Sequence, residues 1–138
     1  MNDTQATVFV VDDDKSVRKS LSRLLRSFGY DVELFASADE FLQRLPCEGV
    51  GCLVLDVQMP GLNGLELQEK LAGCPSMLPI VFITGNTDLS TGVRAMDAGA
   101  SAFITKPFRE ETLLEAIKRA LAECRNGHEG DRHHGGQS

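Results

Sequence analysis

The chain has 138 residues and a mass of 15.0 kDa, and its 20 acidic side chains outnumber its 14 basic ones to give a formal net charge of −6. This length fits a single domain, and a hydrophobic fraction of 42% is that of a folded globular protein rather than a disordered one. The acidic balance disfavours binding to nucleic acid, and the sequence shows neither an apolar run of the roughly 20 residues that span a membrane nor a signal peptide, so we expect a cytoplasmic protein without a membrane partner.

Five strand-like runs alternate with five helical patterns along the chain. Four of the runs are continuously apolar, as in buried parallel strands, whereas the second alternates like an edge strand. Helices are expected where apolar residues recur at helical spacing, with capping residues at some of the starts and glycines after some of the ends. In chain order, the expected elements are a strand at 7–11, a helix between Asp14 and Gly29, a strand at 31–35, a short helix opened by Ser37 and running through Leu45, a strand at 51–55, a helix at 65–71, a strand at 79–83, a helix at 89–98, a strand at 102–104 and a helix at 113–124.

The order strand–helix, repeated five times, predicts an α/β fold in three layers, with a five-stranded parallel sheet and helices on both faces. Residues 1–125 make up this one domain. The segment 126–138 is rich in glycine and histidine and contains no apolar residue, so it predicts a disordered tail.

The histidines and cysteines form no recognisable catalytic or zinc-binding pattern. All three histidines lie in the tail, so the body has no Ser-His or Cys-His pair and no histidine general base. The four cysteines form no CxxC pair, which predicts free or buried thiols in a reducing compartment.

Polar side chains follow four of the expected strands, at or close to the point where each strand ends. They are Asp12, Asp13 and Asp14 after the first, Asp56 after the third, Thr84 after the fourth and Lys106 after the fifth. The carboxyl ends of parallel strands share one edge of a sheet, where α/β proteins place their sites. Clustered carboxylates repel one another, and Mg²⁺ relieves that repulsion by binding carboxylates, waters and phosphoryl oxygens. A lysine and a threonine can hold further phosphoryl oxygens, and a carboxylate can itself act as nucleophile.

Four motifs occur in order at these strand ends: VDDD at 11–14, LDVQMPGLNG at 55–64, ITG at 83–85 and KPF at 106–108. Together they resemble the receiver domain of bacterial two-component response regulators, over about residues 7–124. VRKSL at 17–21 and AMDAGA at 95–100 are similar to the FixJ-type subgroup. The resemblance implies the (βα)5 flavodoxin-like receiver fold. No glycine-rich nucleotide loop is present, so a nucleotide cofactor is not supported.

The resemblance assigns a phosphoacceptor and a metal site. Asp56 would accept the phosphoryl group and form an aspartyl phosphate. Asp13 would bind Mg²⁺ directly, together with Asp56 and the backbone carbonyl of Gln58, whereas Asp12 would act mainly through water. Asp14 heads the first helix and is expected to cap it rather than to bind metal.

The resemblance also assigns residues that bind the phosphoryl group and residues that change position when it is present. Thr84 and Lys106 would hold its oxygens, and the Lys106–Pro107 bond would be cis. Phe103 would occupy an aromatic switch position, with Thr84 as the other switch residue. Their movement would alter the face made by the fourth helix, the fifth strand and the fifth helix.

The partners follow from the same resemblance. The phosphodonor would be a sensor histidine kinase or a phosphotransfer protein, and the only catalysis would be the domain's own phosphorylation and dephosphorylation. The 13 residues after position 125 cannot hold an effector domain, so the chain is expected to be a stand-alone receiver or one excised from a transcription regulator. Output would pass to a partner that the sequence does not identify, or through a phosphorylation-dependent homodimer.

Two other interpretations stay open at this point. The first is a flavodoxin-like domain whose polar strand ends are incidental. The second is a haloacid-dehalogenase-like phosphatase, because Asp12-Asp13-Asp14 nearly matches the nucleophile motif of that family, with Asp12 and Asp14 as the working pair. The second interpretation leaves Asp56 unexplained, and no later acidic motif follows Lys106.

Overall fold

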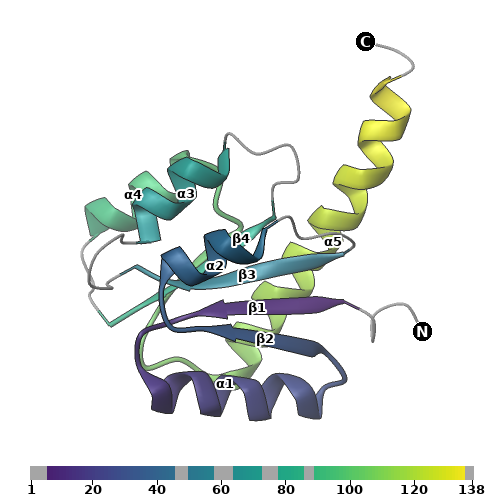
Figure 1. Cartoon of the computed structure of the whole chain (residues 1–138). Helices are drawn as coiled ribbons and strands as arrows, with labels where there is room; N and C mark the ends of the chain where they lie inside the picture. Colours follow the sequence, from purple (N-terminus) through teal and green to yellow (C-terminus); the bar gives the residue numbers. More distant parts are fainter. Residues whose placement is uncertain (1–5, 46–49, 58–63, 73–77, 86–88, 136–138) are drawn as a thin grey trace.

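A computed structural model shows the fold of the chain, and it describes residues 6–45, 50–57, 64–72, 78–85 and 89–135 (Figure 1). Strands and helices alternate throughout, as the sequence predicts. The elements are β1 (Thr7–Val11), α1 (Lys15–Ser27), β2 (Asp31–Phe35), α2 (Ala38–Arg44), β3 (Gly51–Asp56), α3 (Gly64–Ala72), β4 (Ile80–Thr84), α4 (Leu89–Asp97), β5 (Ala102–Thr105) and α5 (Glu110–Gly135).

The five strands form one parallel sheet in the order β2-β1-β3-β4-β5. Val11 pairs with Leu55 in the register of β1 and β3, so the residues that follow them, Asp12 and Asp56, lie side by side. Asp56 in turn pairs with Ile83 on β4, directly before Thr84. The register therefore gathers the carboxyl ends of three strands at one edge.

Helices cover both faces of the sheet, which confirms the predicted three layers (Figure 1). Alternate strand residues point to opposite faces, so that Val10 packs with α1 and α5 whereas Val11 packs with α2, α3 and α4. β3 and β4 are buried along their whole length, as their continuous apolar sequences predict.

The first helix begins where the sequence places its cap. The Asp14 Oδ1 atom accepts hydrogen bonds from the backbone N–H groups of Ser16 at 2.8 Å and Val17 at 3.4 Å. These are N–H groups that have no partner within the helix. Gly29 follows the helix with a φ of +92°, which is a left-handed conformation that glycine adopts without strain. Asp14 is therefore a structural cap, as predicted.

The last helix is longer than its apolar pattern. Cys124 is the last residue of the helix whose burial the structure describes, and it is buried. The helical backbone of α5 continues to Gly135, through most of the segment for which the sequence predicts a disordered tail. Once a helix exists, each further residue adds a hydrogen bond without a new nucleation cost. A pattern of apolar residues does not predict such an extension, because the added residues are polar. The division of the chain at residue 125 stays a prediction.

Two cysteines belong to the core rather than to a site. Cys52 and Cys124 are buried free thiols, and burial raises the pKa of the Cys52 thiol far above its ordinary value, with a further contribution from the nearby Cys124. Both therefore act as small apolar side chains, as the sequence predicts. Cys47 and Cys74 lie outside the described residues.

Candidate functional site

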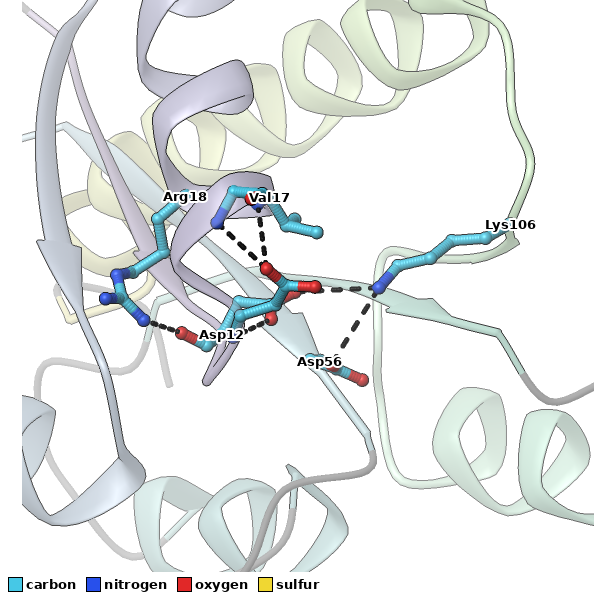
Figure 2. Close-up of polar contacts among 7 residues, drawn as sticks. Asp12, Val17, Arg18, Asp56 and Lys106 are labelled. Carbon is cyan, nitrogen blue, oxygen red and sulfur yellow. Dashed lines mark hydrogen bonds and ion pairs between the residues drawn. The ribbon is translucent and has the colours of Figure 1, made fainter.

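The side chains predicted for the site come together at the carboxyl edge of the sheet. Asp12 follows β1, Asp56 and Thr84 end β3 and β4, and Lys106 follows β5. The Lys106 Nζ atom lies 3.7 Å from Asp12 Oδ2 and 3.9 Å from Asp56 Oδ2 (Figure 2). Thr84 is buried beside them, on the strand that neighbours β3. One ammonium group thus bridges carboxylates from two strands.

Asp12 is fully buried, and its contacts leave one oxygen without a donor. Its Oδ1 atom accepts the backbone N–H of Asp14 at 2.8 Å, and its own N–H donates to the Phe35 carbonyl at 3.1 Å. Among the described residues, Oδ2 accepts no hydrogen bond, and the Lys106 ammonium lies 3.7 Å from it, beyond hydrogen-bond distance. A buried carboxylate oxygen in this state is suited to a cation or to a water that a cation holds.

A third carboxylate completes the cluster. One oxygen from each of Asp12, Asp13 and Asp56 lies within 4.8 Å of the other two, with Asp13 exposed and the other two buried. Three carboxylates against one lysine leave an excess of negative charge, and oxygen donors of this kind are the ligands that Mg²⁺ prefers. The residues present therefore fit Mg²⁺, on the strength of the unpartnered Asp12 oxygen and this donor set.

The backbone passes close beneath the phosphoacceptor candidate at Gly64. A Cβ atom added there would lie 2.8 Å from the Asp56 carbonyl oxygen and 2.9 Å from the Val57 Cα atom. Those contacts are too short for any larger residue. The absence of a side chain at Gly64 therefore lets the chain pass close to Asp56.

The remaining predicted residues lie next to the cluster or outside the described part of the chain. Phe103 is half-buried on β5, where its ring packs on that of Phe82 with centroids 6.2 Å apart. The Lys106–Pro107 bond is cis, as predicted. Gln58, the expected source of a backbone ligand, is outside the described residues.

The sequence patterns do not predict the contacts of two residues near the site. Arg18 donates a hydrogen bond to the backbone carbonyl of Asp12 at 2.7 Å. Gly92 on α4 faces the Phe103 ring, because an added Cβ atom would lie 3.2 Å from it. The sequence nevertheless marks both positions, because a cation near the start of a helix and a glycine inside one each lower helix stability.

The sequence profile of the response regulator receiver domain matches residues 8–118. This chain belongs to that family. The receiver is 49% identical over 121 residues to the response regulator protein TmoT of Ectopseudomonas mendocina, and 42% identical over 121 residues to the transcriptional regulatory protein FixJ of Bradyrhizobium diazoefficiens. These matches cover 88% of the receiver chain but 55% and 59% of the relatives, so the chain spans a little over half the length of the curated relatives.

Solved structures agree with the sequence relatives. The crystal structure of FixJ-N matches with a TM-score of 0.80 and 42% identity, over 86% of the receiver chain and 94% of that chain. A CheY-like receiver domain protein from Methanospirillum hungatei JF-1 matches with a TM-score of 0.79 and 34% identity, over 89% and 98% of the two chains. These matches confirm the FixJ-type receiver assignment and the fold class.

The comparisons also bear on the alternative interpretations. The relatives are response regulators rather than conventional enzymes. Asp14 caps α1 instead of facing the cluster, which removes one of the two residues that the phosphatase interpretation needs. The receiver assignment therefore replaces the phosphatase interpretation.

Within the described part of the chain, no helix combines the length and the apolar character needed to cross a bilayer.

Proposed function

We propose that the receiver accepts a phosphoryl group on Asp56, in the presence of Mg²⁺, from a sensor histidine kinase or a phosphotransfer protein. Family membership makes the chain a two-component receiver, which implies such a phosphodonor. The observation that carries the finer proposal is the cluster of Asp12, Asp13 and Asp56 around the Lys106 ammonium, with one buried oxygen that accepts no hydrogen bond from the described residues.

The metal would be held by residues from two strand ends. Asp13 and Asp56 would bind Mg²⁺ directly, Asp12 would act mainly through a water, and the backbone carbonyl of Gln58 would complete the protein ligands. When bound, Mg²⁺ supplies positive charge that offsets the carboxylates and the oxygens of the incoming phosphoryl group.

The chain's own residues would carry the transfer. A carboxylate oxygen of Asp56 forms a bond to phosphorus while the phosphorus–nitrogen bond of the donor phosphohistidine breaks. The imidazole nitrogen leaves with the electron pair. Lys106, which is already 3.9 Å from Asp56 Oδ2, stabilises the charge on the phosphoryl oxygens, and the Thr84 hydroxyl donates a hydrogen bond to one of them. Catalysis is confined to the domain's own phosphorylation and dephosphorylation.

The new charge would then alter the α4–β5–α5 face. Thr84 moves toward the phosphoryl group and leaves space for Phe103 to rotate, which shifts a two-state population. On this face, Val93 and Met96 of α4 are exposed apolar side chains, at 52% and 46%. They are candidate contacts for an output partner or for a phosphorylation-dependent homodimer.

Intact-mass measurement tests the proposal. The purified chain is incubated with Mg²⁺ and acetyl phosphate, and we expect a gain of one phosphoryl group in an adduct that is stable in acid and labile in base. The Asp56→Asn variant should gain none, because it lacks the nucleophile. The Asp13→Asn variant should gain much less at the same Mg²⁺ concentration.

An Asp31→Asn variant provides a matched control, because Asp31 is an exposed carboxylate at the opposite end of the sheet. It should form the adduct as the unmodified chain does. An adduct that persists in Asp56→Asn would contradict the assignment of the phosphoacceptor.

A further inference from the structure

Arg18 forms a short contact with the backbone of the acidic cluster. Its Nη1 atom lies 2.7 Å from the carbonyl oxygen of Asp12, and the side chain is half-buried. Figure 2 shows Arg18 and Lys106 approaching Asp12 from opposite sides. A hydrogen bond from a guanidinium to a carbonyl is charge-assisted and therefore stronger than one between neutral groups.

The contact fixes the peptide plane that joins two of the three clustered carboxylates. The carbonyl of Asp12 belongs to the same planar unit as the N–H of Asp13, so holding its oxygen limits rotation at both residues. The N–H of Asp12 is held at the same time by the Phe35 carbonyl on β2, at 3.1 Å. The main chain at Asp12 is thus held by α1 on one side and by β2 on the other.

The position of Arg18 on its helix is electrostatically unfavourable. The Arg18 N–H makes an early hydrogen bond of α1, to the Asp14 carbonyl, and the first turn contains no acidic residue. The helix macrodipole places partial positive charge at this end, which disfavours a cation. Arg26, in the last turn of the same helix, makes a similar bond to the Val32 carbonyl at 3.0 Å, but at the end where a cation is favoured.

We propose that Arg18 is a positioning residue for the Mg²⁺ site, which acts by fixing the peptide plane between Asp12 and Asp13. This inference rests on the proposed function, because it takes these carboxylates as the metal site. Residues that orient metal ligands without touching the metal commonly change metal affinity by about 10- to 100-fold when they are replaced.

The sign of the effect separates positioning from simple electrostatics. Arg18 carries a positive charge close to a cation site, so its removal should strengthen Mg²⁺ binding if charge repulsion were the main effect. If Arg18 positions the ligands, its removal should weaken Mg²⁺ binding instead. A role limited to the stability of the fold would leave the dissociation constant of the folded protein unchanged.

Calorimetric titration of the intact chain with MgCl₂ provides the test, and it measures binding without phosphorylation. For Arg18→Met, we expect the Mg²⁺ dissociation constant to rise by about tenfold or more. For the matched control Arg26→Met, which also removes one charge and one arginine–carbonyl bond from α1, we expect a value within about twofold of the unmodified chain. Urea unfolding of both variants confirms that each is folded under the titration conditions.

The outcomes separate the inference from the function on which it rests. An unchanged or tighter dissociation constant for Arg18→Met, or an equal loss in Arg26→Met, would overturn the positioning role while leaving the metal site intact. If Asp13→Asn binds Mg²⁺ as the unmodified chain does, the metal-site assignment itself fails, and the positioning role fails with it.

Discussion

The two faces of the sheet are packed with different kinds of side chain. The face under α1 and α5 is mainly aliphatic. The face under α2, α3 and α4 contains ring pairs, with centroids of Phe9 and Phe41 at 5.8 Å, Phe35 and Phe41 at 5.3 Å, and Phe82 and Phe103 at 6.2 Å. Close-packed layers resist rearrangement, and the Phe103 ring is only half-buried, so moving it would displace less of the core than moving a fully buried side chain.

The helices α5 and α4 also differ in their exposed apolar side chains. Among the described residues of α5, no large apolar side chain is exposed, whereas α4 leaves Val93 and Met96 exposed and places Gly92 against the Phe103 ring. We infer that the α1–α5 face mainly stabilises the fold, and that the α4 face is where packing can change at low cost.

The largest effect is expected from a truncation on the aliphatic face. Ile117 of α5 is fully buried, so Ile117→Ala should lower the free energy of unfolding by about 2–5 kcal/mol, through lost burial and the cavity left behind. Urea unfolding measures this loss. Adduct formation on Asp56, measured where the variant is folded, should be unchanged. A loss below about 1 kcal/mol would mean that this face is not the stabilising one.

A smaller effect on stability, with a change in the packing around Phe103, is expected at Gly92. Gly92→Ala should raise helix stability by up to about 1 kcal/mol, but the new methyl group would lie 3.2 Å from the Phe103 ring and must displace it. We therefore expect little net change in unfolding free energy and a clear change in the NMR signals of that ring.

A double-mutant cycle sharpens this prediction. In a Phe103→Leu background, Gly92→Ala should become stabilising, because the ring that opposes the methyl group is gone. Equal effects of Gly92→Ala in both backgrounds would show that the two residues are not coupled.

A small effect on stability, without a change in the packing of the core, is expected from the surface of the aromatic face. Arg44 forms an ion pair with Glu33 at 2.8 Å and lies over the Phe9 ring, with side-chain exposures of 42% and 37% for the pair. Arg44→Met should cost at most about 1 kcal/mol, and high salt should reduce the difference. Urea unfolding at two salt concentrations measures it. A loss as large as that of Ile117→Ala would contradict the ranking of the two faces.

Much of the fold could be predicted because its signals are local. The continuous apolar strands, the Asp14 cap and the glycine after α1 each depend on a few neighbouring residues. The approach of Asp12 to Asp56 was also predictable, because parallel strands end at the same edge of a sheet. Their roles came from the family resemblance rather than from this geometry.

The rest depends on contacts between elements that sequence patterns do not specify. Nothing in the sequence pairs Arg18 with a backbone carbonyl six residues earlier, since the loop before α1 sets that approach. Gly92 is explained only by the ring that lies against it in space. The helical backbone after Cys124 was not expected, because apolar periodicity ends there.

The buried thiols of Cys52 and Cys124 allow motions of the fold to be measured by chemical modification. Alkylation requires a thiolate and access to reagent. The raised pKa of the Cys52 thiol keeps it protonated. Its burial between β3 and α5 keeps the reagent away. Modification of Cys52 should therefore proceed only through openings of α5 from the sheet, and its rate reports their free energy. Comparing that rate before and after phosphoryl transfer would measure whether a signal received at the strand ends also loosens or tightens the last helix.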